Sequence, residues 1–230
     1  MATTDPTPNT DPLSVLYATD EHLAIRAGGD FVALTPAWQV AAAGSDGAFA
    51  SGSPWDLTSA SIDFEAAGIG PGSVCLLTRP QTTFRGSGVL LAVDQVDGPT
   101  ATLRPIGPGS GSSPVPAAGL SGVVFAFPTL RPQIEDASFD LNRRYGIDPA
   151  SLYRNPSNLV DLRELRAACV VTVLLNRYTF EARGKDGDYR AKARLLRDDL
   201  DQMLARLGLR WTPAVAAPRR TTPFNTRISR

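Results

Sequence analysis

The stretch that decides the fold is NLVDLRELRAACVVTVLLNRYTFEARGKDGDYRAKARLLRDDLDQMLARLGLRW, residues 158–211. Its first half contains no glycine or proline as far as Arg183 and is apolar on nearly all sides between Ala167 and Leu175. A helix that is apolar all round is covered by neighbours. We therefore expect a central helix here, with Asn158 as its N-cap and Asp161 at the third position.

The second half of the stretch predicts an amphipathic helix. A turn is expected at Gly184-Lys185-Asp186-Gly187, and Gly208 is a natural stop. Between them, apolar residues recur every three or four positions, which is the spacing of one helical face: Tyr189, Ala193, Leu196, Leu200, Met203 and Leu207. Arg190, Arg194 and Arg197 occupy other faces, together with the acids Asp198, Asp199 and Asp201.

Three further helices are predicted upstream, over 19–27, 36–44 and 129–146. Thr19 and Thr129 are the expected N-caps of the first and third, and Pro36 stands at the first helical position of the second. Each of these helices ends at a glycine, the usual C-terminal stop. The third carries one face of spaced residues, namely Ile134, Ser138, Leu141 and Tyr145.

Between 48 and 128 the pattern changes to short strands. Glycine, proline, serine and threonine become dense, and four β-rich runs occur at 73–78, 88–96, 100–104 and 122–127. Asp97-Gly98-Pro99 separates two of them as a turn. Short strands in series predict a compact antiparallel β-barrel, and this one resembles the small Src-homology-3-like barrels that decorate phage structural proteins.

Composition restricts the classes of function. The chain has 23 basic and 23 acidic residues, so it generates no long-range field toward DNA or an anionic membrane. No apolar run is long enough to span a bilayer, and no signal peptide is recognisable. The single histidine, His22, lies among acids at a helix start, and Cys75 and Cys169 are expected to be buried thiols. No enzyme activity, metal or cofactor is therefore predicted.

The C-terminal segment PRRTTPFNTRISR, residues 218–230, carries four arginines and no acid. A frayed terminus is one interpretation. The other is a docking arm, because arginines combined with apolar anchors are favoured at interfaces; its candidate residues are Arg219, Arg220, Phe224, Arg227, Ile228 and Arg230. The tryptophans Trp38, Trp55 and Trp211 lie near element boundaries, where core covering is their expected role and contact with a neighbouring subunit the alternative.

The stretch 158–211 resembles the head-tail connector proteins of long-tailed bacteriophages, also called adaptor or head-completion proteins. In that family an apolar helix is followed by a Gly/Asp turn and a helix that opens with aspartate and tyrosine, here Asp188 and Tyr189. The opening LYATDEHLAIRAGGDF and the ending NRRYGID at 142–148 are similar to other helices of such proteins. The β unit is an insertion relative to the minimal helical adaptor, and Arg210-Trp211-Thr212-Pro213 replaces a common acidic turn.

The resemblance implies an α+β protein made of an adaptor-like helical bundle, an inserted antiparallel barrel and an extended C-terminal arm. The expected divisions are a disordered leader 1–12, leading helices 13–47, the barrel 48–128, the main bundle 129–211 and the arm 212–230.

Such a protein would be made in the host cytoplasm and reside in the neck of the virion, as a ring of about twelve copies. The ring joins the portal protein to a stopper or tail-completion protein and extends the channel through which genomic DNA passes without sequence-specific binding. Tyr189, Arg190, Arg194, Arg197 and Trp211 are the candidate subunit-interface residues, with a mixed or net negative channel lining. The alternatives are a tail-completion or stopper component of the same neck, or a nucleic-acid-binding module.

Overall fold

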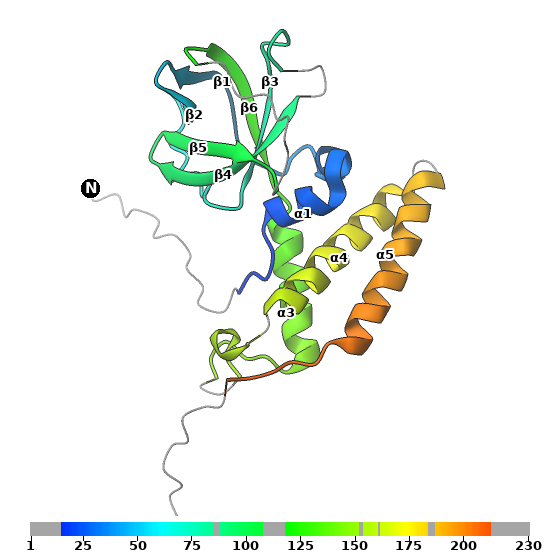
Figure 1. The fold of residues 1–230 in the computed structure, drawn as a ribbon. Helices are drawn as coiled ribbons and strands as arrows, with labels where there is room; N and C mark the ends of the chain where they lie inside the picture. Colours follow the sequence, from blue (N-terminus) through cyan, green and yellow to red (C-terminus); the bar gives the residue numbers. More distant parts are fainter. Residues whose placement is uncertain are drawn as a thin grey trace, which may run out of the picture.

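The computed structural model describes residues 15–84, 88–107, 118–151, 154–160, 162–183 and 187–212, and shows a barrel attached to a layer of helices (Figure 1). The fold is therefore mixed α+β with a small antiparallel barrel, as predicted. The barrel and the helices each have a hydrophobic core of their own.

Among the described residues, six strands close the barrel in the order β1-β2-β5-β4-β3-β6. Every neighbouring pair is antiparallel. Closure leaves no strand edge open to pairing with another chain. The strands are β1 (Val40–Ala50), β2 (Ser53–Thr58), β3 (Val74–Arg79), β4 (Val89–Asp97), β5 (Thr100–Pro105) and β6 (Ser121–Pro128).

The last four strands lie where the sequence predicts them, and the turn at Gly98 has the positive φ of 52° for which glycine is suited. The helix predicted over 36–44 was wrong. Pro36 begins a turn closed by the Gln39 amide, and β1 starts at Val40. The small residues of this segment serve strand packing, because a Cβ on Gly44 would lie 2.6 Å from the ring of Phe125.

The helical layer is built around α4 (Leu162–Glu181), which contacts α1, α2, α3 and α5. Its buried residues include Leu165, Cys169 and Leu174, so the prediction of a covered central helix is confirmed. The surrounding helices are α1 (Asp20–Ala27), α2 (Phe31–Leu34), α3 (Arg131–Tyr145) and α5 (Gly187–Arg206). Single 3₁₀ turns occupy Gly28–Asp30 and Pro156–Asn158.

The cap predicted for α4 was wrong. Asn158 closes a 3₁₀ turn that precedes the helix, and its carbonyl accepts a hydrogen bond from the Thr212 amide at 2.7 Å. Asn155 caps that turn through its side chain. The cap at Thr19 is confirmed: its hydroxyl accepts from the His22 amide, and the His22 ring accepts from the Thr19 amide in return.

Asp20 joins the barrel's last strand to the helices. Its carboxylate is buried and accepts hydrogen bonds from the Leu130 amide and the Thr129 hydroxyl, both at 2.7 Å, where β6 passes into α3. Burial raises the pKa of Asp20, although these hydrogen bonds oppose the rise. Beside it, Glu21 pairs with Arg104 of β5 at 2.7 Å. These two acids fix the first helix to both parts of the molecule.

Candidate functional site

Helix α5, the second helix of the α4–α5 hairpin, is the least covered helix of the helical layer. None of the residues of α5, all of which the structure describes, is buried. Leu196 and Leu200 are half-buried against the helical core, while Leu195 on an outer face is 70% exposed. A twenty-residue helix attached by one half-covered stripe presents two flanks to the surroundings.

One flank of α5 is fixed by polar contacts to the start of the chain. Asp30 accepts hydrogen bonds from Lys192 and from the Tyr178 hydroxyl, both at 2.7 Å. Partial burial opposes ionisation of Asp30, but the two donors outweigh it and lower the pKa of its carboxyl. On the same flank, Arg26 of α1 pairs with Asp199 at 2.7 Å.

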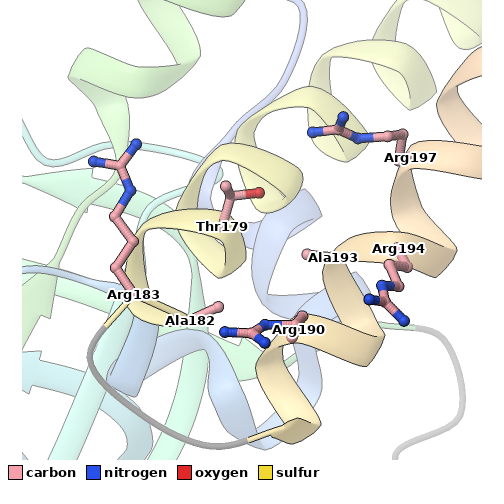
Figure 2. A pocket seen from close by; sticks show the side chains of 7 residues that line it. All are labelled: Thr179, Ala182, Arg183, Arg190, Ala193, Arg194 and Arg197. Carbon is pink, nitrogen blue, oxygen red and sulfur yellow. The ribbon is translucent and has the colours of Figure 1, made fainter.

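The other flank forms a groove with the end of α4, and four arginines stand around it (Figure 2). Arg190, Arg194 and Arg197 come from α5, and Arg183 from the residues that follow α4. Thr179, Ala182 and Ala193 complete the lining, and the volume is about 330 Å³. We call this site the arginine groove. No acidic residue lines it within the described part of the chain.

The four arginines of the groove differ in their contacts from the other arginines that the structure describes. None of them forms an ion pair with another described residue, whereas Arg26, Arg104, Arg131 and Arg177 all do. The spacing i, i+4, i+7 places Arg190, Arg194 and Arg197 on one stripe, where like charges destabilise a helix by about 0.2–0.5 kcal/mol per pair. Asp198 and Asp201 follow Arg194 and Arg197 by four residues and offset part of this repulsion, but neither acid lines the groove.

The sequence places Asp198, Asp199 and Asp201 close to these arginines, on the faces of the helix outside the apolar stripe. Asp199, however, lies on the opposite flank and pairs with Arg26. Helix α5 therefore places Asp199 on one flank and Arg190, Arg194 and Arg197 on the other, although all four lie within ten residues of the sequence.

The structure places the five predicted interface residues in three locations. Arg190, Arg194 and Arg197 meet in the arginine groove. Tyr189 is half-buried, with its ring centroid 5.6 Å from that of Tyr178 in the same chain. Trp211 lies at the far end of α5, where it bridges to Leu159 and packs against the helical core.

The six arm residues, Arg219, Arg220, Phe224, Arg227, Ile228 and Arg230, lie outside the described residues, as do the leader 1–12 and the turn residues 184–186. Trp38 is 82% exposed, so the expectation that it covers a core was wrong. Sequence reasoning missed Arg183, since its position in the groove depends on how α4 and α5 pack. The i, i+4, i+7 spacing of the other three was a readable signal.

The groups considered for catalysis lie apart from this groove. His22 is held in the capping box of α1, and burial lowers the pKa of its ring. Cys75 and Cys169 are buried, as predicted, and burial raises the pKa of both thiols. Among the described residues no group of His, Cys, Asp and Glu is placed to hold a metal ion. No helix in the described ranges is long and apolar enough to cross a membrane.

Comparison with protein-family models, with curated protein sequences and with solved structures gives no match for this chain. The site must therefore be interpreted from its own chemistry. Guanidinium groups around a floor of alanines and aliphatic arginine stems suit a carboxylate-bearing surface that also offers some apolar area.

Proposed function

We propose that the protein is a structural subunit of a phage neck, an adaptor that assembles into a ring between the portal and the stopper or tail and extends the DNA channel. The proposal combines the resemblance of residues 158–211 to head-tail connector proteins with the geometry of the hairpin. In this proposal the helical layer is the adaptor-like bundle, and the barrel, of the Src-homology-3-like kind, is its insertion.

The observation that carries the proposal is the incomplete coverage of α5. Its apolar stripe is half-buried, its Leu195 is exposed, and no described acidic residue lines the groove on its arginine flank. Such a helix completes its contacts only when another molecule covers it. Function is then geometric: each subunit packs against two neighbours, and many weak contacts around a ring add by avidity.

The test is native mass spectrometry of the purified full chain, alone and mixed with the portal protein from the same genome, and of the chain lacking residues 213–230. We expect a closed ring of defined mass with the portal, and loss of portal binding after the deletion. The deletion removes the arginines and the apolar anchors Phe224 and Ile228. A full chain that stays monomeric alone and with the portal contradicts the proposal.

A nucleic-acid-binding module is the second candidate, and the arginine groove is the observation that favours it, because arginine binds phosphate well. Fluorescence anisotropy with a labelled duplex oligonucleotide at two salt concentrations tests it. A phosphate-bound groove predicts binding that weakens steeply with salt. Unchanged anisotropy at low salt excludes this candidate.

A further inference from the structure

We propose that the arginine groove receives the acidic end of the barrel of a second copy of this chain, so that copies join head to tail. This inference rests on the proposed ring and names the surfaces that would form its subunit contact. We call the residues Asp63, Glu65 and Asp97 the acidic barrel end.

The acidic barrel end is a compact group of exposed carboxylates. The Gly98 carbonyl, next to Asp97, accepts hydrogen bonds from the Phe64 amide at 2.9 Å and the Glu65 amide at 3.3 Å. The loop that carries Asp63 and Glu65 is thereby held against the β4–β5 turn. All three side chains are exposed, and none forms an ion pair with a described residue.

The two barrel arginines that the structure describes, Arg79 and Arg104, are too far away to neutralise this end. Arg79 follows Leu77, which is paired with Val89, eight residues before Asp97 along β4. Arg104 pairs with Glu21 and Asp94, and its strand position is opposite Ala92. Ala92 lies five residues before Asp97 along β4, a separation of about 16 Å at the usual rise of a strand. The acidic barrel end is therefore a local negative surface, and the arginine groove is a local positive one.

The chain cannot bring these two surfaces together within one molecule. The β4–β5 turn lies on the opposite side of the structure from the end of α4 and the start of α5, which form the groove (Figure 1). The hydrogen bonds of Asp20 and the ion pair of Glu21 fix the barrel to the helices in that arrangement. Two complementary patches on opposite sides of one molecule generate a heterologous contact, which closes into a ring when the rotation permits.

The shape of the groove favours a protein occupant over a bare phosphate chain. Its floor consists of Ala182, Ala193 and the arginine stems, and Figure 2 shows the guanidinium groups spread around that floor rather than in one row. A turn with Gly98 and Pro99 at its tip can place apolar atoms on the floor and carboxylates at the rim.

The experiment is charge reversal with rescue, measured by sedimentation velocity of the full chain over a range of concentrations. Arg190→Glu with Arg194→Glu reverses the groove, and Glu65→Lys with Asp97→Lys reverses the barrel end. We expect each double variant to weaken self-association roughly tenfold or more, and the two together to restore it to within about threefold of the original. All four residues are exposed, so circular dichroism should show unchanged folding.

Arg163→Glu with Arg166→Glu is the matched control, since both arginines are exposed on α4 and lie outside the groove. We expect this variant to associate like the original chain. If the original chain associates and the groove variant does so equally well, the inference fails while the ring proposal stands. If the original chain is monomeric at every concentration and with the portal, both fail. If a labelled duplex binds and only groove reversal abolishes that binding, the occupant is nucleic acid and the inference is overturned.

Discussion

The barrel and the α4–α5 hairpin differ in how completely they bury their apolar side chains. The barrel closes on itself around Phe49, Phe64, Phe84, Phe125 and Phe127, all of them fully buried, and leaves no strand edge free in the described residues. In the hairpin, α4 is buried on nearly all sides between Ala168 and Leu175, whereas α5 has no buried residue and is held by ion pairs at one flank. The difference separates a part that is complete by itself from a part that offers contacts to others.

The largest expected effect comes from opening the barrel core with Phe125→Ala. The Phe125 ring lies 5.5 Å from Phe64 and 5.9 Å from Phe127 and fills the space beside Gly44 and Gly47. Its removal leaves a cavity, and we expect the free energy of unfolding to fall by about 3–5 kcal/mol in chemical denaturation.

Phe139→Ala is the control for that loss, because Phe139 on α3 is 61% exposed. We expect a change within about 0.5 kcal/mol for this variant. Equal losses in the two variants would contradict the view that the closed aromatic core carries the stability of the barrel.

The second prediction concerns a substitution that weakens the joint between the barrel and the helices. Asp20→Ala leaves the Leu130 amide without its acceptor at the start of α3, and we expect a loss of about 1.5–3 kcal/mol in thermal or chemical unfolding. Asp20→Asn keeps an acceptor oxygen and should lose less. Full stability of the alanine variant would show that the barrel and the helices are joined by other contacts.

The titration of Asp20 should make the stability of this joint depend on pH. Its folded pKa is raised, so below the unfolded value the folded and unfolded states are both protonated and the carboxyl's contribution is fully present. As pH rises through the raised folded pKa, the folded state must hold a buried charge and that contribution is lost. The stability of the original chain relative to Asp20→Asn should therefore decrease with rising pH above the ordinary carboxyl range.

The third prediction concerns a substitution that weakens only the contacts holding the α4–α5 hairpin to Asp30. Asp30→Ala removes the acceptor of Lys192 and Tyr178, and we expect a loss of only about 1 kcal/mol because these groups are partly exposed. Amide hydrogen exchange should speed up in α5 and stay unchanged in β3–β6. Asp188→Ala is the control, since Asp188, the other partner of Lys192, is 70% exposed.

The pH dependence at Asp30 has the opposite sign to that at Asp20. Its folded pKa is lowered, so its contribution is present above the ordinary carboxyl value and is lost as pH falls through the lowered folded pKa. Acid should therefore release α5 before it affects the barrel. Faster exchange in the barrel strands first would contradict this order.

The same two regions differ in how far the sequence could predict them. The four longer helices α1, α3, α4 and α5 and four of the strands follow from local periodicity and turn residues, whereas of the predicted N-caps only Thr19 is found as such. The run VAAAG at 40–44 is helix-favouring by propensity, and its pairing with β6 overrides that preference. For the site, the stripe of Arg190, Arg194 and Arg197 was readable from its spacing, but Arg183 and the pairing of Asp199 with Arg26 depend on tertiary packing.

The smallest expected effect on stability separates folding from function most clearly. Arg190→Ala with Arg194→Ala removes two neighbouring like charges from an exposed flank and introduces the best helix former, so the free energy of unfolding should stay within about 0.5 kcal/mol or rise slightly. Denaturation curves measure this, and sedimentation velocity of the same samples should show weakened association. A large loss of stability would mean that the arginines serve the fold of the hairpin itself. Unchanged stability with weakened association means that these arginines serve contact with another molecule and not the fold of the hairpin.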